Sequence, residues 1–102
     1  MKKVYLLKNT SNDEYKIGIS KHPQQRLKEV QTGNASKIVI CETFESEYAN
    51  KIEKTLHNRY GYARQVGEWF TLGLKVEVEF ITECKQIESN IKILIDMNNE
   101  FI

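Results

Sequence analysis

The chain has 102 residues, a length that allows one domain with a modest core. Its hydrophobic content of 40% and charged content of 28% are those of an ordinary globular domain. No stretch approaches the roughly 20 apolar residues of a membrane span. The apolar run that follows Met1 stops at Lys8, which argues against a signal peptide.

The net charge of +1 conceals an uneven distribution. Residues 1–37 contain eight Lys/Arg and three Asp/Glu, whereas residues 38–102 contain seven and eleven. The N-terminal third could therefore attract a polyanion. Cys41 and Cys84 lack the spacing of metal ligands, so we expect two reduced, buried thiols in a cytoplasmic protein.

Two strands are predicted at the N-terminal end of the chain. Residues 2–8 and 15–20 both show the alternation of a strand. The turn residues 9–13 lie between them, so the two strands should pair as an antiparallel hairpin. In the first strand, one face carries Val4 and Leu6 and the other carries Tyr5 and Leu7.

The second strand has two chemically different faces. The face that belongs in a core consists of Tyr15, Ile17 and Ile19. The opposite face is small or cationic and consists of Lys16, Gly18 and Ser20. Such a face suits a cleft, in which Gly18 would let the backbone of a ligand come close. A solvated edge strand is the alternative interpretation.

A helix should follow this strand directly. Pro23 suits a first helical position, which places Arg26 near the start of the helix. Leu27 and Val30 should face inward, and Gly33 is a fitting residue to end the helix.

Residues 37–44 are the third predicted strand, and their continuous apolar run is typical of a strand covered on both sides. Ser46 can cap a second helix that extends to about Tyr60. The apolar stripe of this helix consists of Ala49, Ile52, Leu56 and Tyr60. Glu53 and His57 are four residues apart and share a face beside that stripe. A basic, aromatic loop follows, ending in Gly67-Glu68-Trp69-Phe70.

The last segment, residues 74–97, reads as a long third helix. Its apolar residues recur at three- and four-residue spacings close to a heptad seam: Val76, Phe80, Cys84, Ile87, Ile91 and Leu94. Such a helix either wraps the small domain or pairs with a partner, for example in a homodimer. The predicted fold is therefore α/β, with a three-stranded sheet, flanking helices and a long C-terminal helix. We divide this single domain into a core, residues 1–72, and a C-terminal brace or oligomerisation helix, residues 73–102.

Four residues follow one another along the chain in an order that resembles a known family. Tyr5 and Lys16 are eleven positions apart, Lys16 and Arg26 are ten apart, and Glu53 follows on a later helix. The order resembles the GIY-YIG nuclease superfamily, with Lys3-Val4-Tyr5 as its first motif and Lys16-Ile17-Gly18 as its second. The match is closest to the phage- and bacteria-associated branch whose second motif reads Tyr-Lys-Ile-Gly.

The resemblance spans about residues 3–72 and includes the segments 53–57 and 68–70. This chain departs from the family pattern at three points. The first motif lacks its glycine, Lys16 replaces the tyrosine of the second motif, and the family's late asparagine has no counterpart.

The resemblance implies metal-dependent hydrolysis of phosphodiester bonds in DNA, with RNA as the other possible substrate. Tyr5 would be the general base, and Lys16 would supply the cation that favours its phenolate. Arg26 would hold the phosphate oxygens, because its planar fork matches them. Glu53 would bind Mg²⁺ or Mn²⁺, and His57 would orient Glu53 or a water. The location would be the cytoplasm, that of a bacterial host if the protein is encoded by a phage.

Two other functions remain open from the sequence. A nuclease-like module could bind nucleic acid or a protein partner without cutting, an interpretation that Lys16 and the near-neutral net charge favour. A dimerising structural protein built on the long helix is the third interpretation, and it leaves the N-terminal constellation unexplained.

Overall fold

The computed structural model describes residues 1–64 and 69–100, the last three of these by their helical backbone alone. The Gly67-Glu68 part of the aromatic loop lies outside the described residues. Four antiparallel strands form one sheet in the order β3-β1-β2-β4. They are β1 (Lys3–Asn9), β2 (Glu14–Ser20), β3 (Ile38–Glu45) and β4 (Phe70–Thr71).

The predicted hairpin is confirmed, with Tyr5 opposite Gly18 and Leu6 opposite Ile17. The predicted count of three strands is wrong because β4 adds a fourth. β4 has only two residues, which pair with Glu14 and Tyr15 of β2. A strand of this length is too short to show alternation, so no sequence pattern announces it.

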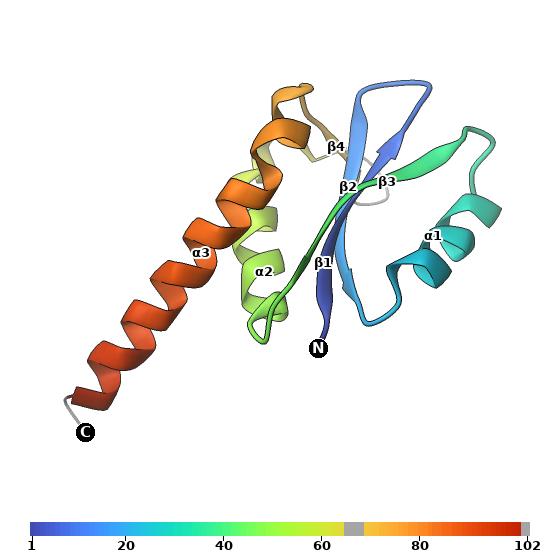
Figure 1. Ribbon diagram of the computed structural model, residues 1–102. Coiled ribbons are helices and arrows are strands. Elements are labelled where there is room, and N and C mark those ends of the chain that lie inside the picture. The colour runs from blue at the N-terminus through green and yellow to red at the C-terminus, as the bar shows by residue number, and fades with distance from the viewer. Residues whose placement is uncertain (65–68, 101–102) are drawn as a thin grey trace.

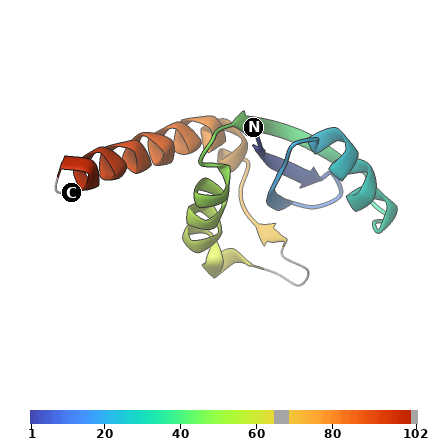
Figure 2. The same cartoon turned by 90° about the horizontal axis from the view of Figure 1, so that it is seen from below.

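Helices cover both faces of the sheet (Figure 1). Helix α1 (Pro23–Thr32) lies against one face, whereas α2 (Ala49–Arg59) and α3 (Lys75–Glu100) lie against the other. A short 3₁₀ turn, η1 (Gly61–Ala63), follows α2. Figure 2, which shows the molecule from below, separates α1 from the pair formed by α2 and α3. The helices therefore begin close to the predicted positions, and both faces of the central strands are buried.

The alternation in β1 and β2 distributes the core over these two faces. Val4, Leu6, Tyr15 and Ile17 pack with the buried stripe of α2 and with the first half of α3. The smaller cluster on the α1 side contains Tyr5, Leu7 and Ile38, with Leu27 and Val30 of α1 packed against it. The facial assignment made from the sequence is confirmed.

Ser46 does not cap α2, contrary to expectation. The helix begins three residues later, at Ala49, and its N-cap residue Tyr48 makes no side-chain cap bond. Ser46 is buried instead, where its Oγ accepts a hydrogen bond from the Tyr48 backbone N–H at 3.0 Å and donates to Glu88 of α3 at 2.6 Å. The hydroxyl thus stabilises the turn before α2 and fixes α3 to it.

Both cysteines are free thiols, and Cys84 is fully buried. Cys41 is only partly buried, so the expectation of two buried thiols is wrong for this residue. Its position on β3, an edge strand, leaves one side uncovered, and its Sγ donates to Glu77 Oε1 at 3.1 Å.

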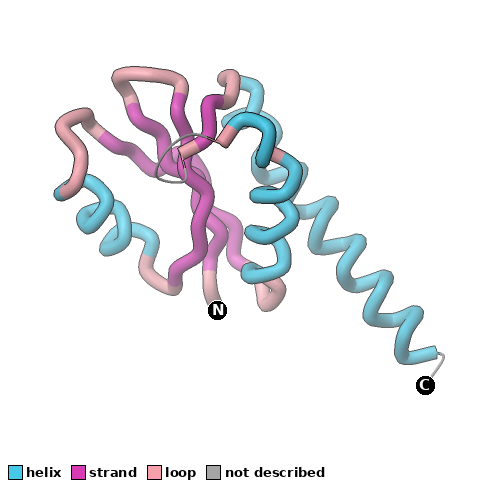
Figure 3. Tube along the Cα trace, turned by 180° about the vertical axis from the view of Figure 1, so that it is seen from behind, coloured by secondary structure: helices cyan, strands magenta, loops and turns pink. Residues whose placement is uncertain are grey.

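The first half of α3 wraps the domain and the second half extends beyond it (Figure 3). Val76, Phe80, Cys84 and Ile87 are buried, so the predicted seam is confirmed to that point. Leu94, which the heptad pattern placed in the same seam, is 60% exposed because the core ends before it. Among the helices described here, none has the length and apolar character needed to cross a membrane.

Candidate active site

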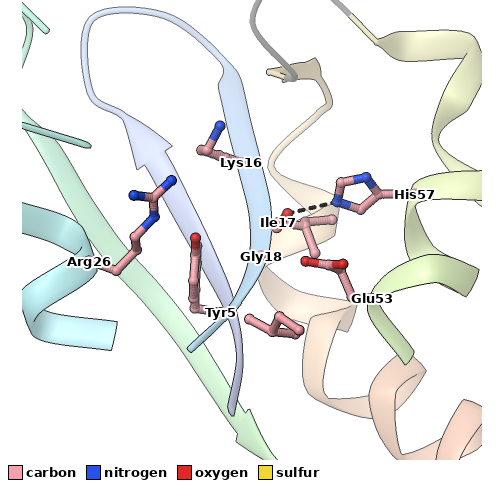
Figure 4. Close-up of a pocket in the computed structure, with 8 residues that line it drawn as sticks. Tyr5, Lys16, Ile17, Gly18, Arg26, Glu53 and His57 are labelled. Atoms are coloured by element: carbon pink, nitrogen blue, oxygen red, sulfur yellow. Dashed lines mark hydrogen bonds between the residues drawn. The ribbon is translucent and has the colours of Figure 1, made fainter. Parts of the chain in front are cut away.

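A cavity of about 460 Å³ collects the residues singled out from the sequence (Figure 4). Its lining consists of Tyr5, Lys16, Ile17, Gly18, Ile19, Arg26, Glu53 and His57. These residues come from β1, β2, α1 and α2, four elements that are far apart in the sequence. All five predicted site residues therefore border one space.

The cavity bends around the outer edge of β2. Tyr5 and Arg26 lie on the α1 side of the sheet, and Glu53 and His57 reach the cavity from α2 on the other side (Figure 4). This is possible because β4 pairs with β2 only at Glu14 and Tyr15 and leaves the rest of that edge without a neighbouring strand among the described residues. The sequence did not reveal this arrangement, because the length of β4 decides it.

Tyr5 and Gly18 are directly opposite each other on the paired strands. A Cβ atom built on Gly18 would overlap the Oη and Cζ atoms of Tyr5. The phenol ring thus lies across the glycine, and only a residue without a side chain leaves room for it. The prediction that the space above Gly18 admits a ligand's backbone is wrong, because the Tyr5 ring fills this space.

Arg26 lies in the first turn of α1, where its Nη1 donates to Glu29 Oε2 at 2.7 Å. Hydrogen bonding to Glu29 and to the Tyr5 hydroxyl raises the pKa of the Arg26 guanidinium. Arg26 is thus a cation beside the Tyr5 hydroxyl, a position that sequence reasoning had given to Lys16.

Lys16 takes a different position in the structure. Its Nζ lies 5.8 Å from the centroid of the Trp69 ring, a geometry that suits a cation–π contact. Lys16 still lines the cavity and gives it a second cationic residue. Sequence reasoning noted Trp69 as part of a motif but did not connect it with Lys16.

Glu53 and His57 are one turn apart on α2, and both side chains are partly buried. The Glu53 carboxylate points toward β2 beside Gly18 (Figure 4). His57 Nε2 lies 2.7 Å from the backbone oxygen of Ile17. Because a carbonyl oxygen can only accept, Nε2 carries the proton of this bond. The His57 ring also meets Phe70 edge to face, with 5.2 Å between the ring centroids.

The chemistry of the cavity matches a phosphate and one hard cation. Arg26 and Lys16 offer positive charge, and Glu53 offers a carboxylate. Residues 1–64 and 69–97, whose side chains the structure describes, contain no group of three or more His, Cys, Asp or Glu side chains that could enclose a metal. A single carboxylate suits Mg²⁺, which keeps most of its water and commonly takes its remaining ligands from a substrate phosphate.

A comparison with family models provides the classification. The T5orf172 domain model matches residues 2–89, which include the whole sheet, both shorter helices and the first half of α3. The chain belongs to the T5orf172 domain family. T5orf172 is a phage-associated domain that occurs in nuclease-like proteins. No curated protein and no solved structure matched the chain.

Proposed function

We propose that this T5orf172 domain is a metal-dependent endonuclease of the GIY-YIG type that hydrolyses phosphodiester bonds in DNA. The observation that carries the proposal is that Tyr5, Arg26 and Glu53, from three different elements, line one cavity. A general base, a phosphate-binding cation and a metal-binding carboxylate are the groups that such hydrolysis needs.

As a phenolate, Tyr5 would take a proton from the attacking water and become a neutral phenol, and the adjacent Arg26 would stabilise the phenolate before this transfer. The same guanidinium would donate to a non-bridging oxygen of the phosphate. To do so, it would have to give up its hydrogen bond to Glu29. Lys16 would add positive charge where negative charge develops at phosphorus.

Glu53 is the residue that would hold the metal, Mg²⁺ or Mn²⁺. When bound, the ion would polarise the phosphate and neutralise the departing oxygen. His57 would keep α2 against β2 through its bond to Ile17. Its role would therefore be to position α2, not to contact the attacking water.

The first experiment compares wild type with Glu53→Ala on supercoiled, linear and single-stranded DNA, with Mg²⁺, with Mn²⁺ and with EDTA. We expect metal-dependent cutting by wild type and none by Glu53→Ala, which should fold normally because a partly exposed acid on a helix stabilises little. Glu47→Ala removes an exposed acid outside the cavity and serves as the matched control.

Binding of DNA, measured by gel retardation in EDTA, separates the roles of the residues. Glu53→Ala should bind as well as wild type or more tightly, because one negative charge has left the site. Arg26→Ala should weaken both binding and cutting, since the guanidinium would contact phosphate before and during the reaction.

A binding module that does not cut is the second candidate function. Lys16 in the position of the family's motif tyrosine favours it. A wild-type protein that retards DNA or RNA but never nicks either in Mg²⁺ or Mn²⁺ would decide for this candidate.

A further inference from the structure

The outer edge of β2 carries backbone groups whose direction follows from three contacts. In an antiparallel strand the N–H and C=O of one residue point to the same side, and successive residues alternate. Leu72 N–H donates to Asp13 O at 3.2 Å, just before β2 begins. Tyr15 pairs with Phe70 of β4, and Ile17 O accepts from His57 at 2.7 Å.

Asp13, Tyr15 and Ile17 therefore all direct their backbone groups away from β1. Ile19 is the next residue in this alternating series, so its N–H and C=O point to the same outer side. The pairing of β4 ends at Tyr15, and Ile19 itself lines the cavity. Its backbone N–H is thus directed toward the space between Glu53 and the Tyr5–Arg26 pair.

We propose that the backbone N–H of Ile19 is a phosphate-binding donor of this cavity, held in place by the bond of His57 to Ile17. A backbone N–H suits an anion and cannot bind a cation, and the cavity already brings Arg26 and Lys16 to the same space. The donor would contact a non-bridging phosphate oxygen on the side opposite Arg26. This inference rests on the proposed function, because it assigns a further ligand contact to the same substrate.

The direct test replaces Ile19 by its α-hydroxy acid, which leaves the side chain intact and exchanges the amide for an ester without the N–H. The matched control is the same exchange at Thr43 of β3. Ser46 N–H donates to Lys2 O, so even-numbered residues at this end of β3 face β1 and Thr43 faces outward at the opposite edge of the sheet. Each ester also makes the preceding carbonyl a weaker hydrogen-bond acceptor. That carbonyl belongs to Gly18 in the first case and to Glu42 in the second, and both face β1.

The probe is the thymidine dinucleotide d(TpT), titrated in EDTA so that it remains uncut, with inorganic phosphate as a second probe. We expect d(TpT) to bind about tenfold more weakly to the Ile19 ester and to bind the Thr43 ester as it binds wild type. In wild type the amide proton of Ile19 should show a saturable downfield NMR shift with both probes. This second measurement does not depend on whether the ester variant folds.

The inference is overturned if the Ile19 amide shows no saturable shift, or if the two esters bind d(TpT) equally. Plasmid cutting by wild type in Mg²⁺ reports on the proposed function separately. If wild type cuts plasmid but the Ile19 amide proton shows no saturable shift, this inference is contradicted and the proposed function is not. A shifted Ile19 amide without any cutting supports the phosphate contact and contradicts the nuclease.

Discussion

The contact between Tyr5 and Gly18 determines where the phenol hydroxyl lies. The two residues are cross-strand partners, and the ring lies over the glycine because no Cβ atom occupies that space. Tyr5 is only 3% exposed, so its ring cannot move outward without leaving the small core on the α1 side. The position of the proposed general base thus depends on a neighbour that has no side chain.

Gly18→Ala should displace the Tyr5 ring from this position. We expect a loss of about 1–3 kcal/mol in the free energy of unfolding, because the added methyl overfills a packed site. Plasmid cutting should fall at least tenfold, since a general base acts only at the correct distance. Urea unfolding and the cutting assay measure the two effects.

Gly73→Ala is the control for this substitution, because a Cβ at Gly73 would meet nothing within 4 Å. Equal behaviour of the two alanine variants would contradict the role that we give to Gly18.

The sequence predicted which residues form the site better than it predicted the contacts among them. The faces of Tyr5 and Lys16 follow from strand alternation, and Pro23 fixed the start of the helix that carries Arg26. The partner of Arg26 could have been found as well, because Glu29 lies three residues later on the same helix. The contact between Tyr5 and Gly18 could not be predicted, because it depends on the register of a hairpin whose loop, residues 10–13, is longer than a two-residue turn.

At the scale of elements, the acidic side chains of α3 explain the negative charge of the C-terminal part of the chain. Three glutamates accept hydrogen bonds from the elements beneath the helix: Glu77 from Cys41, Glu83 from Tyr60 and Glu88 from Ser46. Lys8 also lies 3.6 Å from Glu77. These carboxylates thus join α3 to β1, to β3 and to the residues that flank α2, in addition to the apolar seam.

The bond between Ser46 and Glu88 should be the most sensitive of these attachments, because Ser46 is buried. We expect Ser46→Ala to lower the free energy of unfolding by about 1–3 kcal/mol. Glu88→Gln should cost less in the wild-type background and almost nothing after Ser46→Ala. Urea unfolding of the two single variants and the double variant measures this coupling.

Ser89→Ala, at an exposed position of the same helix, serves as the control and should leave the unfolding midpoint unchanged. Additive effects of Ser46→Ala and Glu88→Gln would show that the two side chains do not interact in solution.

The element boundaries show what sequence patterns miss. The long helix was predictable from its apolar spacing, but the point at which it leaves the core was not, because the pattern continues through Leu94. Ser46 has the residue type of a helix cap, and its use as a buried link to α3 depends on a contact 42 residues away. Local patterns contain no information about such distant contacts.

At the scale of the whole molecule, buried ionisable groups predict a loss of stability at alkaline pH. Burial, with Glu83 and Glu88 nearby, raises the pKa of Cys84 from 9.0 to about 12. Burial, with Glu77 nearby, raises the pKa of Tyr15 from 10.0 to about 12. Both groups keep their protons to a higher pH in the folded state than in the unfolded state. Their contribution to stability is therefore complete below pH 9 and is lost as the pH rises toward 12.

We therefore expect the free energy of unfolding to fall above about pH 9, by roughly 1.4 kcal/mol per pH unit for each of these groups once its unfolded form has ionised. Urea unfolding between pH 7 and about pH 10.5, under reducing conditions, measures the slope. Cys84→Ala should be less stable at neutral pH but should lose stability less steeply above pH 9. An unchanged slope in this variant would contradict the assignment to Cys84.

The second half of α3 gives the molecule its elongated shape of 52 × 27 × 22 Å. Ile93, Leu94 and Met97 are between 49% and 60% exposed on this segment. Removing the residues after Asn90 should leave the fold and the cutting activity intact and should change the mass in solution or the solubility. Light scattering and the plasmid assay check this. Loss of cutting at an unchanged mass would contradict a role in association.

The order of the elements along the chain has a consequence for synthesis on the ribosome. Tyr5, Lys16 and Arg26 lie within a hairpin and the helix that follows it, whereas Glu53 comes 27 residues after Arg26. Contacts over short separations cost little loop entropy and form early. We expect the nascent chain to assemble the proposed phosphate-binding half of the site first, while the acid proposed to bind the metal is still being translated. If the proposed function holds, a polypeptide stopped at that stage would carry the cations that bind nucleic acid but would lack the acid needed to cut it.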